Sequence, residues 1–449
     1  MDPASCQAVI EPAAATGPAP EPPTPGLLRA GVITYVYSAL ILAANLLSGV
    51  TSARALGPSG RGITVALVTL TQLIGFIFAM GVAQSLSLFI ARAPANGPKL
   101  LTAWMLLLAP CSVVGILIGE ALLPLVFSTH IPGAVATGRW FMLTVVLVIA
   151  SELNYGLLLG MHDFTIYNFL RFAQPALMAG SFLVLWRLGA LHVTTALVAP
   201  TAASALVLAL GMARSVRRIG FARPDFPLAV QTLWYGLRGQ GTLVATHVNA
   251  RFDVAMLPAY VVAASVGLYS VATNVSLIVF QLSSTLAALL IPTAARDPER
   301  APARIVDSLY ASLLIAGALA LAIGLLATPL LGVVYGHAFR QASSSLRLLL
   351  PGAVLFAGSS ITSAGVYAAG RPFTASLAQV AGLVVTVLGL VIFLPTGGIT
   401  AAAIVSTASY ATVFVTTLIA FKYTTSLSWR GLIPAPRRLR SLVDRASAR

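Results

Sequence analysis

The chain has 449 residues, of which 58% are hydrophobic and only 9% are charged. Soluble proteins carry roughly 25% charged residues, so this chain lacks the polar surface that would cover a water-soluble particle of 46.5 kDa. Together with a mean hydropathy of +0.92, this excludes a cytosolic enzyme, a secreted domain and a disordered chain. What remains is an integral membrane protein with many spans.

The net charge of +15 would point to nucleic acid if the protein were soluble. In a polytopic membrane protein it has a simpler origin, because basic residues gather in cytoplasmic loops and set the orientation. We therefore expect no nucleic-acid partner. The two cysteines, Cys6 and Cys111, are too few for a disulfide framework and are predicted to be free thiols.

The two ends of the chain differ from its middle. Residues 1–28 lack Lys and Arg and are rich in proline, which predicts a disordered cytoplasmic tail rather than a signal peptide. Residues 424–449 are polar and basic, and they are predicted to form a second cytoplasmic tail that suits an anionic membrane surface.

Apolar runs fill the region between the tails. A helix needs about 20 residues to cross a ~30 Å hydrocarbon core, and twelve runs are long enough. They predict an all-α polytopic membrane protein of about twelve transmembrane helices. The runs lie at about 30–53, 62–90, 101–127, 140–160, 165–187, 191–212, 232–257, 259–291, 305–335, 346–369, 373–394 and 399–421.

A basic segment, 213–231, follows the sixth run and is predicted to be a cytoplasmic linker between two six-helix lobes, 29–212 and 232–423. The lobes repeat each other weakly. Gly62 and Gly267 open corresponding spans at an offset of 205 residues, and Gly189 matches Gly398 at 209. Because six is an even number, both lobes keep the same orientation, so the repeat is parallel about an axis along the membrane normal.

The basic residues also predict the orientation. With twelve crossings, 20 of the 27 Lys and Arg residues fall on the side of the two termini and 7 on the other. Short cytoplasmic loops are enriched in basic residues, so both termini are predicted to be cytoplasmic in a multi-pass protein of the cell membrane. The seven on the outer side are Arg54, Arg61, Arg139, Arg187, Arg251, Arg340 and Arg347. Of these, Arg54 and Arg61 flank a Gly/Pro loop and are predicted only to bracket the membrane.

Signatures of catalysis and of metal binding are missing. The sequence contains no GxxxxGK[ST], CxxC or HExxH pattern, and its twelve Asp and Glu residues have no sizeable aqueous loop to occupy. We therefore expect neither an enzyme nor a bound cofactor or metal, and coupling to H⁺ or Na⁺ stays open. Two lobes with little mass outside the bilayer indicate a carrier whose lobes rock about a central cavity.

Three stretches carry a family resemblance. They are "SARALGPSGRG" between the first two spans, "ARFDVAMLPAYVVAASVGLYSVATNVSLIVFQLSSTLAALLIPTAAR" over 250–296, and "AGRPFTASLAQVAGLVVTVLGLVIFLPTGGITAAAIVSTASYA" over 369–411. They resemble the polysaccharide-biosynthesis (O-antigen-type) oligosaccharide flippases of the multidrug/oligosaccharidyl-lipid/polysaccharide exporter superfamily. The likeness covers about residues 29–423. Its motifs are moderately specific for the superfamily and weak for any substrate.

The resemblance implies alternating-access flipping of lipid-linked oligosaccharide across the cytoplasmic membrane for cell-surface polysaccharide biosynthesis. It also implies contact with membrane lipid, with a polyprenyl-linked oligosaccharide and with polysaccharide assembly proteins. One alternative is a cation-coupled drug or small-molecule antiporter of the same fold. Cation exchange requires an acidic residue in the first spans, and the first two spans contain none. A flippase for the cell-wall precursor and a membrane enzyme or scaffold are the others.

A sugar head group loses its hydration inside hydrocarbon, so a flippase needs hydrogen-bonding and cationic side chains on inward helix faces. In the interrupted run 232–257, His247 and Arg251 are four residues apart and share one helix face, whereas Asn249 shares another with Asp253, which is expected to cap a loop. Intramembrane ionisable residues are site hypotheses by default, and a hydrogen-bonded core role is the alternative for each. The candidates for the substrate cavity are Glu152, Arg171, Arg238, His247, Asn249, Arg251, Gln174, Asn45 and Gln72, with Asn154, Asn274 and Gln281 as weaker ones.

Glu152 and Arg171 are the sharpest pair. They lie about ten residues before and about eight after a turn near 162–163, so antiparallel helices would place them within about 3 Å of the same depth. Each alone in hydrocarbon costs about 2.5–3.5 kcal/mol or more, which favours their facing one another. At an offset of 209 the second lobe has Ile361 and Val380 instead. The pair is thus predicted to be a substrate-side feature, with a local staple as the alternative.

Overall fold

The computed structural model describes residues 25–127, 130–131, 133–296 and 301–425. Most of both predicted tails therefore lies outside the described residues, as does Cys6, whereas Cys111 is a free thiol. The helices are α2 (Pro25–Phe78), α3 (Val82–Arg92), η1 (Pro94–Asn96), α4 (Gly97–Phe127), α5 (Gly133–Met142), α6 (Val145–Gly160), α7 (Phe164–Arg187), α8 (Val193–Ile219), α9 (Phe226–Met256), η2 (Leu257–Ala259), α10 (Ala263–Arg296), α11 (Ala301–Leu325), α12 (Ala327–Val334), η3 (His337–Ala342), α13 (Ser343–Ala368) and α14 (Pro372–Thr425). No strand occurs among the described residues.

The longest helices, α2 and α14, each contain two spans. Each has 54 residues, which would extend about 81 Å as one straight helix, far more than a ~30 Å hydrocarbon core. A glycine with non-helical dihedral angles breaks each of them, Gly57 (φ 64°, ψ −177°) in α2 and Gly398 (φ 54°, ψ −140°) in α14. Glycine suits both positions because a Cβ would be strained at positive φ.

The described helices account for the twelve predicted crossings. Nine stretches of the described residues are long and apolar enough to cross a membrane, and two of these, Val36–Arg92 and Phe373–Thr425, are long enough to cross twice. The remaining crossing is α9, whose polar residues lower its hydropathy, as the sequence suggested. Large apolar side chains such as Leu117, Leu125 and Leu321 are more than 60% exposed, as expected for side chains that face lipid.

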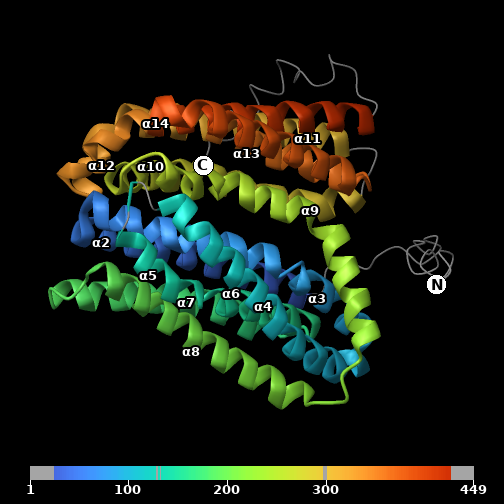
Figure 1. The fold of residues 1–449 in the computed structure, drawn as a ribbon. Coiled ribbons are helices and arrows are strands. Elements are labelled where there is room, and N and C mark those ends of the chain that lie inside the picture. The colour runs from blue at the N-terminus through green and yellow to red at the C-terminus, as the bar shows by residue number, and fades with distance from the viewer. Residues whose placement is uncertain (1–24, 128–129, 132, 297–300, 426–449) are drawn as a thin grey trace.

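The helices form two groups (Figure 1). Helices α2 to α8 pack together in one group and α10 to α14 in the other, and α9 runs from the first to the second. The predicted linker 213–231 is mostly helical, because α8 continues to Ile219 and α9 begins at Phe226. Only the six residues between these helices are non-helical.

The internal repeat is visible in the contact between α2 and α10. A Cβ on Gly62 would lie 1.8 Å from the carbonyl oxygen of Ala263, and a Cβ on Gly267 would lie 2.0 Å from the carbonyl oxygen of Pro58. Because Gly62 and Gly267 are equivalent positions of the two halves, 205 residues apart, these reciprocal contacts resemble those at a twofold interface. Gly189, the predicted equivalent of Gly398, also has positive φ, at 66°.

Candidate functional site

A cavity of about 250 Å³ lies between four helices of the first group and α9. Helices α6 and α7 contribute Glu152 and Arg171, and α9 contributes His247. Three of the residues that the sequence singles out thus share one cavity, although they come from three helices. The lining residues are Phe76, Ala83, Gln84, Ser87, Glu152, Tyr155, Leu159, Tyr167, Arg171 and His247.

Two glycines of α6 set the position of Glu152. A Cβ on Gly156 would lie 2.7 Å from the Cα of Ala83, and a Cβ on Gly160 would lie 3.1 Å from the carbonyl oxygen of Leu86. Small residues four apart let membrane helices approach closely, and here they seat α6 directly on α3. Glu152 lies one turn before Gly156, so the contact aims the carboxylate toward the α3 residues that line the cavity.

Glu152 and Arg171 face the same cavity without forming a direct ion pair in the part of the chain that the structure describes. The turn between their helices is short, since α6 ends at Gly160 and α7 begins at Phe164. The guanidinium carbon of Arg171 lies 5.3 Å from the ring centroid of Tyr167, within cation–π range. Both charged side chains thus line the cavity, and Arg171 lies against the ring of Tyr167.

Tyr167 also packs edge-to-face against Tyr155, with ring centroids 5.7 Å apart. On the opposite wall, the His247 ring stacks on Phe76, with centroids 4.2 Å apart and an interplanar angle of 25°. The cavity thus combines one carboxylate and one guanidinium with several aromatic faces. That set offers charge-assisted hydrogen bonds and flat apolar surfaces to a ligand.

The opposite face of α9 is buried against the second group of helices. Asn249 is 2% exposed, and its Oδ1 accepts hydrogen bonds from Thr386 (2.5 Å) and Ser409 (2.9 Å) of α14. Asn249 and Asp253 do share a face, but that face points away from the cavity. Among the described residues, those that line the cavity therefore do not include Asn249.

Asp253 does not cap a loop as the sequence predicted. It is 1% exposed, and its Oδ2 accepts hydrogen bonds from Tyr269 of α10 (2.5 Å) and Ser406 of α14 (3.0 Å). Its Oδ1 accepts from the backbone N–H of Val254 (2.7 Å). The expectation failed because a local pattern at the end of α9 carries no information on the two helices that close over it. Asp253 joins α9, α10 and α14.

The other predicted residues lie elsewhere. Arg251 donates to Asn274 of α10 at 3.2 Å, and Gln174 donates to Ser204 of α8 at 2.8 Å. Asn45 and Gln72 are exposed residues of α2, and Gln72 lies one turn before Phe76 on the same face. The backbone of Arg238 lies within α9, and its side chain is outside the described residues.

The sequence missed the aromatic and polar partners in the cavity, although a helical-spacing signal was present. Tyr155 follows Glu152 by three residues, and Tyr167 precedes Arg171 by four, so each shares a helix face with its charged neighbour. Gln84 and Ser87 gave no such signal because α3 carries no charge near them. Their role depends on α6 packing on α3.

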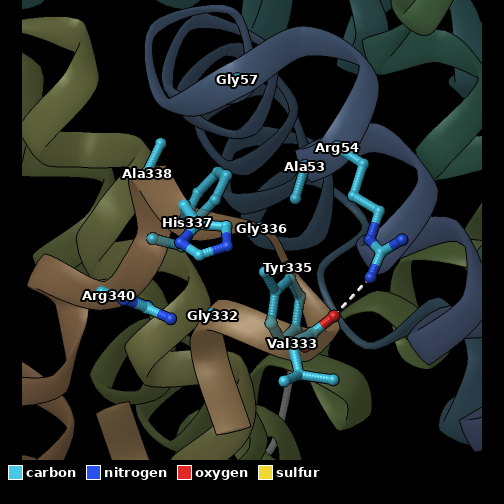
Figure 2. Close-up of a pocket in the computed structure, with 11 residues that line it drawn as sticks. Ala53, Arg54, Gly57, Gly332, Val333, Tyr335, Gly336, His337, Ala338 and Arg340 are labelled. Carbon is cyan, nitrogen blue, oxygen red and sulfur yellow. Dashed lines mark hydrogen bonds between the residues drawn. The ribbon is translucent and has the colours of Figure 1, made fainter. Parts of the chain in front are cut away.

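Beside the break in α2, arginines hold the two groups of helices together, and Figure 2 shows one of them, Arg54. Arg61 is 2% exposed and donates to the Gly49 carbonyl oxygen (2.5 Å), to Ser52 (2.8 Å) and to Ser270 of α10 (3.3 Å). Arg54 donates from Nε to the carbonyl oxygen of Val334 at 2.9 Å and from Nη2 to that of Val333, the bond drawn in Figure 2.

The prediction that these arginines only bracket the membrane is therefore wrong. Arg61 is drawn inward because Gly62 and Gly267 bring α2 and α10 into backbone contact beside it. Phe76 of the cavity lies 15 residues after Arg61, which is about 22 Å along a helix. The two groups are thus sealed together beside the break in α2, and the cavity lies toward the other end of the span that follows this break.

Solved structures with a similar fold include transporters of two kinds. A lipid II flippase MurJ in an inward closed conformation superimposes with a TM-score of 0.74 at 13% identity, covering 89% of each chain. An inward-facing multidrug resistance MATE family transporter of the MOP superfamily gives 0.62 at 15% identity, covering 88% of this chain and 97% of that one. The MATE multidrug transporter DinF-BH, solved in a complex, gives 0.59 at 13% identity, covering 90% of this chain and 97% of that one.

The chain has the fold of the MurJ and MATE transporters. The fold of about twelve spans in two lobes that the sequence predicted is therefore confirmed, and so is the superfamily resemblance at the level of the fold. No family model and no curated protein matches the chain. At such low identity, the likeness shows the fold alone and does not identify a substrate.

Proposed function

We propose that this protein flips a lipid-linked oligosaccharide across the cytoplasmic membrane by alternating access, with both termini cytoplasmic. The observation that carries the proposal is the cavity between α2, α3, α6, α7 and α9, in which Glu152, Arg171 and His247 meet two tyrosines. Phe76 of the cavity lies at one end of the second span of α2, and the arginines that join the helix groups lie at the other end, beside the break at Gly57. A carrier needs such a polar cavity, open to one side at a time.

The residues of the cavity suit a sugar head group on an anionic lipid carrier. Arg171 offers a planar fork of donors that matches phosphate oxygens, and Glu152 accepts hydrogen bonds from hydroxyl groups. The faces of Tyr155 and Tyr167 give a sugar ring apolar contact area together with hydroxyl partners. In the cycle we propose, the head group binds Arg171 in place of the Glu152 carboxylate. After the head group is released, Glu152 interacts with Arg171 again.

The test is transport by single variants. Proteoliposomes would hold the purified protein and a lipid-linked oligosaccharide, and an external glycosidase would report the glycan that reaches the outer leaflet. Arg171→Gln and Glu152→Gln should each slow the glycan's appearance by about tenfold or more, because each loses a charge-assisted contact. The proposal fails if wild-type protein does not accelerate flipping above empty liposomes.

Matched controls are available on the same scaffold. Arg187→Gln removes an exposed arginine at the end of α7, and Glu120→Gln removes an acid that only meets Arg139 across 3.8 Å. Neither residue lines the cavity, so both variants should flip at the wild-type rate. Equal losses in controls and cavity variants would mean that the assay reports folding.

The orientation has a separate test. Arg223 is an exposed residue between α8 and α9, and Ser59 is exposed next to the break in α2. In a Cys-free background, Ser59→Cys should react with a membrane-impermeant maleimide from outside intact cells. Arg223→Cys should react only after permeabilisation, and the reverse pattern would overturn the orientation.

A cell-wall precursor flippase is the second candidate, because the MurJ structure superimposes with the higher TM-score of the two transporter kinds reported above. The two candidates differ in the glycan that the lipid carries. Rescue of cells depleted of their precursor flippase, without transport of a surface oligosaccharide, would favour this second function. A cation-coupled antiporter would instead confer resistance to cationic drugs that depends on Glu152, and coupling to H⁺ or Na⁺ stays a proposal in each case.

A further inference from the structure

A second and larger cavity, of about 540 Å³, lies at the sealed end between the break in α2 and the segment that follows α12 (Figure 2). Arg54 and Gly57 line it from α2, and Tyr335, His337 and Arg340 line it from the other group of helices. It is separate from the cavity that contains Glu152, and the function proposed above does not use it. We propose that this second cavity binds a phosphate group.

The charge of the lining supports an anionic ligand. Its residues include two arginines and a histidine, and none of the lining residues is acidic. Arg61 adds a further buried guanidinium, 6.0 Å from the ring centroid of Tyr335. Basic residues are depleted on the outer side of a membrane protein, so a cluster on the predicted outer side calls for an anionic partner.

Two of the basic side chains in the lining have no hydrogen-bond or ion-pair partner among the described residues. Arg54 uses Nε and Nη2 on the carbonyl oxygens of Val334 and Val333. By contrast, the side chains of His337 and Arg340 make no hydrogen bond or ion pair to any residue that the structure describes. They are therefore available to a ligand, whereas Arg347 on the same predicted side donates to the Gly324 carbonyl oxygen at 3.0 Å.

The Arg340 side chain occupies space that the absence of a side chain on Gly332 leaves open. A Cβ on Gly332 would lie 2.6 Å from Nε of Arg340, so the guanidinium arm lies directly over that glycine. A guanidinium presents paired donors that match two oxygens of one phosphate. The cavity volume falls in the range of small-molecule sites and exceeds what a single phosphate needs.

The same chemistry has two sources, inorganic phosphate and the head group of an anionic phospholipid. Val333 lines the cavity and is 71% exposed, which gives the opening an apolar rim of the kind that a lipid would contact. Because both helix groups line the cavity, a bound phosphate favours the state in which they are together at this end. The ligand would thus stabilise the sealed conformation.

The first experiment compares the thermal unfolding of the purified full chain in inorganic phosphate with that in chloride at equal ionic strength. The second compares nanodiscs containing phosphatidylglycerol with nanodiscs of phosphatidylcholine alone. We expect stabilisation in at least one comparison. Stabilisation by phosphatidylglycerol alone assigns the site to a lipid head group, and stabilisation by phosphate assigns it to the free anion. No stabilisation in either comparison overturns the proposal.

Variants then locate the effect. Arg340→Gln should lower the apparent affinity for the effective ligand by about tenfold. Gly332→Ala should do the same without removing any charge, because the added methyl group displaces the Arg340 side chain. Arg187→Gln, which removes a distant exposed arginine of the same predicted side, should leave the affinity unchanged. An unchanged affinity in both Arg340→Gln and Gly332→Ala would overturn the site.

A labelling experiment covers the case in which Arg340→Gln fails to fold. Ala53 lines the cavity and is 1% exposed, so a cysteine there reacts with maleimide only when the two groups separate. In Ala53→Cys of an otherwise Cys-free chain, the effective ligand should slow labelling at least about fivefold, as expected from linkage. Labelling at the same rate with and without that ligand would contradict the proposal.

Discussion

The α6–α7 pair of the first half and the corresponding α13–α14 pair of the second half share a backbone turn but differ in the side chains they carry. In the first, the Asp163 N–H donates to the Leu158 carbonyl oxygen at 2.9 Å, and in the second the Arg371 N–H donates to that of Val366 at 3.1 Å. A residue with positive φ precedes each donor, His162 (56°) and Gly370 (75°).

Beyond these turns the two pairs diverge. The two turns are 208 residues apart, which makes Ser360 and Gln379 the counterparts of Glu152 and Arg171, whereas the offset of 209 from the sequence gives Ile361 and Val380. None of these four residues of the second half is charged, so the fold of a lobe does not require charges at these positions. The charged pair is an addition to the scaffold, as a ligand site would be.

The two ends of the second span of α2 also differ in how closely they are packed. At one end Gly62 and Gly267 permit backbone contact, and buried Arg61 bonds across it. The cavity with Glu152 lies away from this contact, and its lining residues come from α2, α3, α6, α7 and α9. Close packing beside the break in α2 and a cavity farther along the same span would suit the carrier that we propose.

The largest expected effect comes from breaking the glycine contact. Gly267→Val would place side-chain atoms on the Pro58 carbonyl, which lies 2.0 Å from the position of a Cβ. We expect a loss of about 3 kcal/mol of stability, measured as a lower unfolding temperature in detergent. Gly317→Ala is the control, because nothing lies within 4 Å of its Cβ. Equal stability of Gly267→Val and wild type would show that the sealed end is not closely packed.

The next effect comes from making the two halves alike. A Glu152→Ser, Arg171→Gln double variant introduces the residues that the turn alignment gives for the second half, and it leaves the net charge unchanged. Flipping should fall by about 100-fold, because the head group loses both charged contacts, whereas the unfolding temperature should change little. A Glu120→Gln, Arg187→Gln double variant should transport normally. Wild-type flipping by the copied pair would make Glu152 and Arg171 a local staple.

A smaller effect is expected at Asp253. Tyr269→Phe removes one hydrogen-bond donor to a buried carboxylate, and we expect a cost of about 1–2 kcal/mol. Tyr260→Phe is the control, because Tyr260 is only half-buried and is not bonded to Asp253. Chemical denaturation of the two variants measures the difference. If both lose the same amount, the bond to Asp253 contributes nothing specific.

The smallest effect is expected at the exposed arginine of the seal. Arg54→Gln loses its bonds to the carbonyl oxygens of Val333 and Val334, so the two groups should separate more often at this end. Maleimide labelling of Ala53→Cys should rise by about fivefold. Arg139→Gln, which changes another exposed arginine of the same predicted side, should leave labelling unchanged. A rate that Arg54→Gln does not raise would remove this residue from the seal.

The sequence by itself determined the number of spans and their repeat. It also singled out Glu152 and Arg171, which line one cavity without a direct ion pair among the described residues. These features depend on hydropathy and on spacing along one or two neighbouring helices, which are local properties. The sequence also contained the aromatic partners Tyr155 and Tyr167 at helical spacing, although only the cavity made their role visible.

Only the tertiary structure decided which polar residues of α9 line the cavity. On one face of α9, His247 stacks on Phe76, and on the other face Asn249 and Asp253 bond to the second group of helices. It also decided the role of Arg61, which bonds to Ser270, a residue 209 positions away. Contacts between residues so far apart in the sequence form only after whole helices have packed. Here small residues such as Gly62 and Gly267 determine the packing, because the absence of a side chain lets the two helices approach closely.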